Sequence, residues 1–308
     1  MPIEFRSFTD RDLPILSQLL NEANRGSYQF YPYDEDRLRK WIQDVKLQIL
    51  IAEENGAVTG SAAYADGHWG EEIEWLVVRE SPGNKLAESL LLTEIEKFVK
   101  RGVVFYSIDA GNPKIDDWIE YGYKPEGGLY HMIARLDGAK PLPKVPECIS
   151  LRSLKPNEEK ELVEVVNAGF GYERLKKGII ERWKTENPPF TEEWVHVAES
   201  ENKIVSVVAS RTDANYNKNF GAKRAYLGPA TTLSEFRGKN LASALTQRAM
   251  NLLFEKGMDP VGLYTGEQNI ASVTLLRKLG FQIGHHWKFM RKYWPNRAQT
   301  SIPKESMS

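Results

Sequence analysis

The chain repeats itself at a fixed distance, and this repeat constrains its fold more than any other feature. The stretch IEFRSFTDRDLPILSQLLNEA, which begins at Ile3, matches ISLRSLKPNEEKELVEVVNAG, which begins at Ile149, 146 positions later. The same offset pairs Ala52-Glu53 with Ala198-Glu199. A repeat of this length, in a chain of 308 residues, predicts two similar domains rather than one large one.

The segments outside the repeat set the expected boundaries. LDGAKPLPKVPE lies between the halves, and its prolines favour an extended linker. The end of the chain, PNRAQTSIPKESMS, has too few apolar residues to pack. We therefore expect domains at 1–140 and 148–294, a proline-rich linker at 141–147 and a flexible tail at 295–308.

Each half predicts a mixture of helices and strands. In the second half, WVHVAES and KIVSVVASR alternate like the strands of a hairpin that turns at Glu201-Asn202. RAYLGPATTL and VGLYT predict further strands, and a helix is expected from Leu241 to Lys256, ended by Gly257. The predicted fold class is therefore α/β (α+β), with a mixed central sheet flanked by helices in each domain.

The composition is that of an ordinary soluble protein. The net charge of -1 does not favour nucleic acid or an anionic membrane, and no apolar run is long enough to cross a bilayer. One cysteine excludes an intrachain disulfide, and no histidine has the spacing of a metal site. We expect a cytoplasmic monomer or homodimer that binds no metal, nucleic acid or membrane.

The polar turn SEFRGKNLASAL, residues 234–245, suggests a ligand. A loop that leads directly into a helix leaves several backbone N–H groups without partners, and the helix dipole adds partial positive charge there. Gly238 allows close approach of the backbone, and Arg237 and Lys239 add charge for a phosphate. The turn alone is equally compatible with a solvated basic helix start that binds nothing.

A second motif lies downstream at the expected distance. In GEQNIASVTLLRKLGFQIG, Asn269, Ser272 and Leu275 stand at helical spacing before Gly280. With the turn from Arg237 to Ala242, this pattern resembles the GNAT superfamily of acyl-CoA-dependent N-acyltransferases in a tandem, two-domain arrangement. That family usually has glycine where Asn240 stands here, and asparagine is the best substitute if the residue needs a positive φ.

The resemblance implies a fold and a cofactor site. In this family the thioester lies between two splayed parallel strands, here YLGPATTL and VGLYT. Gly228-Pro229 fits a bulge in the first of them, and an edge-strand interruption explains this dipeptide nearly as well. It implies acetyl-CoA as co-substrate and a small-molecule or peptide amine as acceptor. The residues implied to hold acetyl-CoA are Thr231, Thr232, Leu233, Arg237, Gly238, Lys239, Asn240, Leu241, Ala242, Asn269 and Ser272. Asn269 is equally explained as a plain helix N-cap.

The usual catalytic groups of the family are replaced. Its glutamate position on the first splayed strand holds Tyr226, and its helix tyrosine position holds Leu276. Tyr264 is our candidate for the acid, with a packed core aromatic as the alternative. Glu267 is our candidate for the base, with a solvated loop carboxylate as the alternative. The chemistry is expected in the second domain, and the alternative function is a non-catalytic acyl-CoA sensor or interaction module.

The first half departs further from the family pattern. Pro82 stands where the turn's arginine is expected and Lys85 where its glycine is expected, although Glu72 falls at the family's base position. We expect that the first domain has lost pyrophosphate binding and serves packing or acceptor recognition. In the second domain the acceptor is expected near residues 169–194, which carry the aromatic residues Phe170, Tyr172, Trp183 and Phe190. An exposed aromatic group there could equally be a contact surface for the first domain.

Overall fold

A computed structural model describes residues 3–67, 70–79 and 84–295. Its described residues form two compact units. Unit 1 contains the residues up to 128 and those from 286 onward, and unit 2 contains residues 129–285. The expected tail, apart from Pro295, and the Pro82 turn of the first half lie outside the described residues.

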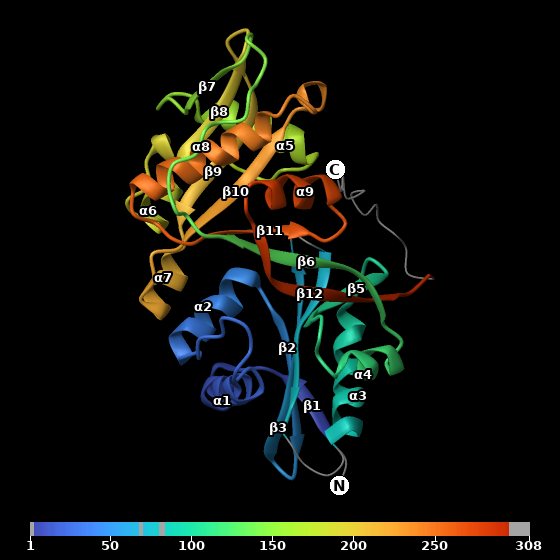
Figure 1. The fold of residues 1–308 in the computed structure, drawn as a ribbon. Coiled ribbons are helices and arrows are strands. Elements are labelled where there is room, and N and C mark those ends of the chain that lie inside the picture. Colours follow the sequence, from blue (N-terminus) through green and yellow to red (C-terminus); the bar gives the residue numbers. More distant parts are fainter. Residues whose placement is uncertain (1–2, 68–69, 80–83, 296–308) are drawn as a thin grey trace. The chain divides into compact units, whose positions relative to one another are not determined.

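Unit 1 is a mixed sheet with helices on both of its faces. Its strands follow the order β1-β2-β3-β4-β5-β12, in which only the β4–β5 pair is parallel. Helices α1 and α2 lie on one side of this sheet and α3 and α4 on the other (Figure 1). Trp75 packs with the leucines of α1, and Leu91 belongs to a second apolar cluster on the opposite side. The elements are β1 (Glu4–Ser7), α1 (Leu13–Ala23), α2 (Glu35–Val45), β2 (Gln48–Glu54), β3 (Ala57–Gly67), β4 (Gly70–Val78), α3 (Asn84–Ile95), β5 (Val103–Asp109), α4 (Ile115–Glu120) and the last part of β12 (Gln282–Tyr293).

Unit 2 repeats this arrangement. Its strands follow the order β6-β11-β10-β9-β8-β7, and again a single pair, β10–β11, is parallel. Helices α5 and α8 pack on β9 and β10 around one apolar core. The elements are β6 (Lys124–Ala134), β7 (Ser150–Ser153), α5 (Glu159–Phe170), α6 (Ile179–Glu186), β8 (Val195–Ser200), β9 (Lys203–Thr212), α7 (Ala214–Phe220), β10 (Ala225–Thr232), α8 (Leu241–Glu255), β11 (Val261–Gly266) and α9 (Ile270–Lys278).

The repeat extends to individual ion pairs. Arg6 bonds Asp12 at 2.6 Å and Glu53 at 2.7 Å in unit 1. In unit 2, 146 positions later, Arg152 bonds Glu158 at 2.7 Å and also bonds Glu199. In both units this arginine joins the first strand to the second strand and to the start of the first helix. The expected fold class and tandem organisation are therefore confirmed.

The two units differ from the expected boundaries in their last strands. Residues 287–293 of β12 pair with β5 and complete unit 1, although they come from the end of the sequence. Residues 129–134 of β6 pair with β11 and complete unit 2, although they precede the linker. Each sheet thus takes its last strand from the other half of the sequence, so the units do not coincide with 1–140 and 148–294.

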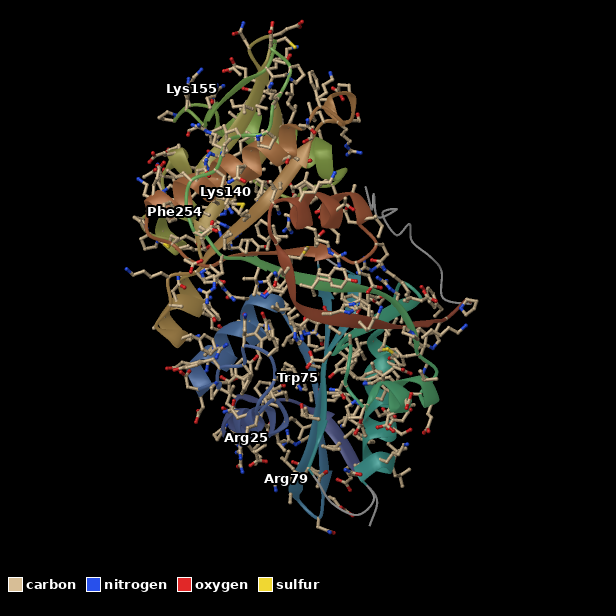
Figure 2. All side chains as sticks on the ribbon, in the orientation of Figure 1. Arg25, Trp75, Arg79, Lys140, Lys155 and Phe254 are labelled. Carbon is tan, nitrogen blue, oxygen red and sulfur yellow. The ribbon has the colours of Figure 1, made fainter. Side chains whose placement is uncertain are left out.

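The proline-rich segment is attached to unit 2. The backbone N–H of Lys140 donates to Asn251 Oδ1 at 2.9 Å, and Asn251 Nδ2 donates to the Lys140 carbonyl at 2.8 Å. Figure 2 labels Lys140 of this segment and Phe254 of α8. Residues 141–147 form no helix or strand. Among the residues that the structure describes, no helix is long and apolar enough to span a membrane.

Candidate functional site

The parallel strands of unit 2 separate soon after they meet. β10 and β11 pair only at Ala225–Val261 and Tyr226–Gly262. β10 then bulges at Gly228-Pro229, where its register with β9 shifts, and continues along β9 to Thr232. The expected splayed strands and bulge are both confirmed. Backbone groups on the side of β10 that faces away from β9 are therefore available beyond the bulge.

The ladder with β9 shows which of these groups face the gap. The Leu233 N–H donates to the Val205 carbonyl at 3.0 Å, and the Leu233 carbonyl accepts from Phe236 at 2.9 Å. Because neighbouring residues of an antiparallel strand point their backbone groups in opposite directions, Thr232 directs its N–H and C=O away from β9. The Thr232 carbonyl accepts from Arg237 Nε at 3.2 Å. Of the three expected pantetheine contacts, Thr232 is the one oriented toward the gap.

The turn before α8 has an open, uncommitted backbone. Gly238 has a φ of +76° with nothing near the position of a Cβ, and Asn240 has a φ of +61° as the residue before Leu241. Asparagine therefore meets the positive-φ requirement that glycine meets elsewhere in the family. Within the described part of the chain, the amides of Gly238 to Ser243 have no acceptor, and the first bonded amide is that of Ala244. Six N–H groups at the start of a 15-residue helix form a site suited to phosphate oxygens.

Arg237 and Lys239 flank these amides at the surface. Arg237 bends back onto the carbonyl of Thr232, and the Lys239 ammonium lies 4.6 Å from the centre of the Phe236 ring. Leu241 is buried in the apolar core, so its side chain anchors the helix while its amide stays in the open set.

Asn269 and Ser272 stabilise the start of α9. Asn269 Oδ1 accepts from the Ser272 N–H at 3.0 Å, which is the N-cap geometry considered above. The Ser272 hydroxyl lies 3.2 Å from Thr265 Oγ1 of β11 and so ties the helix to the second splayed strand. A contact of either residue with a cofactor stays a prediction.

Tyr264 is not a packed core aromatic, because 40% of it is exposed. Its ring stacks on His131 of β6 at 4.6 Å between centroids and lies 5.8 Å from the ring of Tyr226. The Tyr226 ring lies against Gly228, at the point where the strands separate. Burial raises the pKa of Tyr226 and lowers the pKa of His131 to about 4, so both side chains are neutral near pH 7.

Two further positions were considered for catalysis, Leu276 and Glu267. Leu276 is buried in the core beneath α9, so nothing replaces the missing tyrosine hydroxyl there. Glu267 follows β11 in the loop before α9 and is half-buried. Its role as a base stays a prediction.

The structure brings one cation to this site that sequence reasoning missed. Arg211 of β9 is the register partner of Tyr226, and its guanidinium carbon lies 5.4 Å from the centre of the Tyr226 ring and 5.1 Å from that of Trp183. Trp183 and Phe190 are buried and pack edge to face, and docking of the acceptor in this segment stays a prediction. Phe170 and Tyr172 are half-buried, and Arg174 lies over the Phe170 ring at 5.8 Å.

The corresponding position in unit 1 has different chemistry. β4 and β5 pair only at Glu72–Phe105 and Ile73–Tyr106, so these strands also separate. Ser107 donates to Glu72 at 3.0 Å, and burial, reinforced by the charge of Glu74, raises the pKa of Glu72 to about 8. Ala65 stands opposite Glu72, where unit 2 has Arg211 opposite Tyr226.

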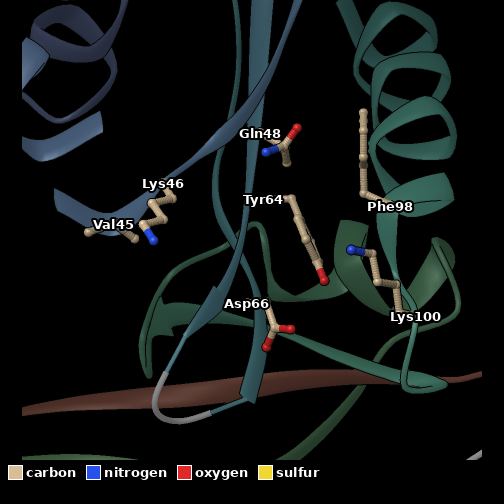
Figure 3. A pocket seen from close by; sticks show the side chains of 7 residues that line it. All are labelled: Val45, Lys46, Gln48, Tyr64, Asp66, Phe98 and Lys100. Carbon is tan, nitrogen blue, oxygen red and sulfur yellow. The ribbon is translucent and has the colours of Figure 1, made fainter. Parts of the chain in front are cut away.

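A cavity of about 470 Å³ lies elsewhere in unit 1, between the end of α2, strands β2 and β3, and the residues after α3 (Figure 3). Tyr64 lines it and donates to the buried Glu71, which also accepts from the amides of Lys100 and Arg101 at 2.7 Å. Asp66 in its wall is paired with Arg101. The polar groups of this cavity are thus largely engaged with one another. Among the described residues, no group of His, Cys, Asp and Glu could hold a metal ion.

Comparison with known proteins supports the interpretation of the splayed strands and the open turn. Residues 160–281 match the Acetyltransferase (GNAT) family. A mycothiol acetyltransferase of Arthrobacter sp. (strain FB24) is 25% identical over 169 residues, covering 53% of this chain and 51% of that protein. One from Thermobispora bispora is 27% identical over 171 residues, covering 52% and 56%. The chain spans about half the length of the curated relatives it matches.

Solved structures extend the fold similarity to nearly the whole chain. A GCN5-related N-acetyltransferase from Sphaerobacter thermophilus matches with a TM-score of 0.70 at 20% identity, covering 94% of this chain and 95% of that one. A tandem GNAT protein from the clavulanic acid biosynthesis pathway matches with a TM-score of 0.62 at 16% identity, covering 95% and 98%. The chain therefore shares its fold with these solved structures. The match of residues 160–281 to the Acetyltransferase (GNAT) family agrees with the resemblance that the sequence motifs predicted.

Proposed function

We propose that this chain is an acetyl-CoA-dependent N-acetyltransferase and that unit 2 carries out the chemistry. The observation that carries this proposal is the set of uncommitted amides from Gly238 to Ser243, placed directly after the strand that separates from β11. These amides would hold the pyrophosphate, with Arg237 and Lys239 adding charge at the rim. Thr232 would bond the pantetheine arm from the gap.

Acetyl-CoA supplies an activated acetyl thioester, which an uncharged amine can attack directly. The chain must orient that amine, accept its proton and protonate the departing thiolate. Tyr264 is the residue best placed for proton transfer to the thiolate, because it is partly exposed on the second splayed strand beside Tyr226. A thiol with a pKa of about 8.5 is already a fair leaving group, so this contribution is moderate. Glu267 remains our candidate for the base.

The acceptor would be an amine of a small molecule or peptide. The mycothiol acetyltransferases among the relatives support acetylation of an amine as the reaction. Because the match covers only about half of each relative, we do not carry their substrate over to this chain. We also expect the chain to act in the cytoplasm, as a monomer or homodimer.

The test is a calorimetric titration of the chain with acetyl-CoA, followed by an assay of thiol release with a panel of amines. Because Cys148 is exposed and would react with thiol reagents, the assay uses the Cys148→Ser chain. One acetyl-CoA per chain and amine-dependent thiol release are expected. Binding without release for any amine would favour the non-catalytic acyl-CoA sensor, and absence of binding would refute both functions.

A further inference from the structure

Arg211 in unit 2 is a half-buried cation without a carboxylate partner among the described residues. Arg211 makes no hydrogen bond or ion pair with any residue in the described ranges, and its contacts are the faces of Trp183 and Tyr226. Burial lowers the pKa of its guanidinium, while the charge of Glu186 acts in the opposite direction. Removing a charge from water without a partner is costly, so such groups are normally paired.

Other arginines of the same unit follow that rule. Arg224 is buried against Asp213 at 2.6 Å, and Arg152 binds Glu158 and Glu199. Glu186, whose charge reaches Arg211, is bonded to Arg182 at 2.9 Å instead. Arg211 thus differs from Arg152 and Arg224, which are neutralised by carboxylates.

The geometry leaves the donors of Arg211 available. Rings on which a guanidinium stacks engage its flat faces, while its N–H groups point outward in the guanidinium plane and can bind a carboxylate with two parallel hydrogen bonds. A second cation, Arg174, affects both Arg211 and Tyr226 and also makes no ion pair within the described residues. Together they favour an anion beside Tyr226.

The position of this cation connects it to the acceptor. Tyr226, opposite Arg211, is also the last residue that β10 pairs with β11 before the strands separate. A group bound by Arg211 therefore lies next to the place where the amine would meet the thioester. We propose that the acceptor is a small amine that carries a carboxylate, and that Arg211 binds this carboxylate. The proposal rests on the proposed acetyl transfer in unit 2.

The test compares amino acids with their carboxamides, which keep the amine and side chain but lack the negative charge. Thiol release from acetyl-CoA is measured with a pool of each, for the Cys148→Ser chain and for the same chain with Arg211→Gln, Arg211→Lys or Arg182→Gln. Arg182→Gln is the matched control, because it removes an arginine that already has a carboxylate partner. Acetyl-CoA affinity is measured for every variant and is expected to be unchanged, which shows that the fold is intact.

With Arg211 present, kcat/KM should be higher for the amino acids than for the carboxamides. Arg211→Gln should lower kcat/KM for the amino acids by about 10- to 100-fold and leave that for the carboxamides unaffected. Arg211→Lys should fall between the two, and Arg182→Gln should change neither pool. Equal use of both pools, or an equal loss for both in Arg211→Gln, would overturn the carboxylate site while the acetyltransferase function stood.

A binding measurement keeps the two proposals separable. N-acetylated amino acids, which resemble the product, are titrated against the chain without acetyl-CoA. Binding that Arg211→Gln weakens at least tenfold supports the subsite even if no amine is turned over, in which case only the proposed function fails. Binding that Arg211→Gln leaves unchanged, or no binding by the unsubstituted chain, refutes the subsite whatever the turnover.

Discussion

Replacing Glu72 by glutamine should change how the stability of the protein depends on pH. Glu72 is half-buried on β4, and burial raises its pKa from an ordinary 4.5 to about 8, with Glu74 acting in the same direction and the Ser107 hydrogen bond opposing both. Between these two pH values the folded chain retains a proton that the unfolded chain has released. The free energy of unfolding therefore falls as the pH rises through this window. Glutamine cannot ionise, so it removes that fall.

The size of the effect follows from the shift. One proton taken up differentially changes the free energy of unfolding by about 1.4 kcal/mol per pH unit. From pH 5.5 to 7.5 we expect the free energy of unfolding of the Glu72→Gln chain to rise by about 2 kcal/mol relative to that of the unsubstituted chain. This is slightly less than one whole proton would give, because Glu72 keeps some contact with water.

The measurement is equilibrium unfolding in urea at pH 5.5, 6.5 and 7.5 for both chains. Glu4→Gln serves as the control, because it removes the same charge from an exposed position on β1 of the same unit. A difference between Glu72→Gln and the unsubstituted chain that does not change with pH would refute the assignment of a buried, protonated carboxyl. Because the chemistry is proposed for unit 2, amine turnover is expected to survive Glu72→Gln, and its loss would move the reaction to unit 1.

Four further substitutions test individual contacts in unit 2. Arg237→Ala should weaken acetyl-CoA binding about tenfold without unfolding the chain, because it removes one charged contact with the phosphates. Calorimetry measures this affinity, and an unchanged value would contradict the pyrophosphate assignment. Tyr264→Phe should lower kcat more than it changes KM for the amine, and an unaltered rate would remove Tyr264 as the acid. Gly169→Ala should cost about 1–3 kcal/mol in urea unfolding, because its Cβ would lie 1.9 Å from Thr231 Oγ1, and Thr231→Ala should restore part of the loss. Asn240→Ala should cost about 1 kcal/mol in the same assay and Asn240→Gly much less, since the residue has a φ of +61°.

The sequence predicted the features of the fold that depend on local spacing. The hairpin at Glu201-Asn202 was predictable from the alternation in the two strands on either side of it. Its turn residues have φ values of 50° and 62°, which suit asparagine better than glutamate. The helix from Leu241 to Glu255 followed from its apolar stripe and the glycine near its end. The positive φ at Asn240 was predictable because the GNAT turn usually has glycine at this position, and asparagine is the residue that best replaces glycine there.

The exchange of the last strands could not be predicted in this way. Residues 124–134 and 282–293 both read as antiparallel strands that follow a helix, and either could pair with β5 or β11. Alternation shows which face of a strand is buried, but it does not show which of two similar sheets the strand joins. That choice depends on long-range packing. It is ambiguous in a repeated sequence, because β5 and β11 occupy corresponding positions in the two sheets.

The catalytic region was predictable only in part for a related reason. The missing glutamate and tyrosine could be located by counting from the motifs, but the partner of Tyr226 is set by the register across the β9–β10 bulge, and one residue of slip would have turned Arg211 to the other face. The signal in the sequence was a second charged residue, Arg211, at the end of the mainly apolar stretch KIVSVVASR.

The matched positions of the two units argue for divergence of their ligands. At the point where the parallel strands separate, unit 1 has a carboxyl, Glu72, opposite Ala65, whereas unit 2 has Tyr226 opposite Arg211. A carboxyl in a poorly hydrated setting favours a positively charged or hydrogen-bond-donating ligand, and an arginine without an anion favours a negative one. The two positions therefore favour ligand groups of opposite charge. If the repeat arose by duplication, the two halves have kept the strand geometry and the Arg6 and Arg152 networks while changing the charge that faces the gap, so a chain with two related folds is expected to acetylate through one of them.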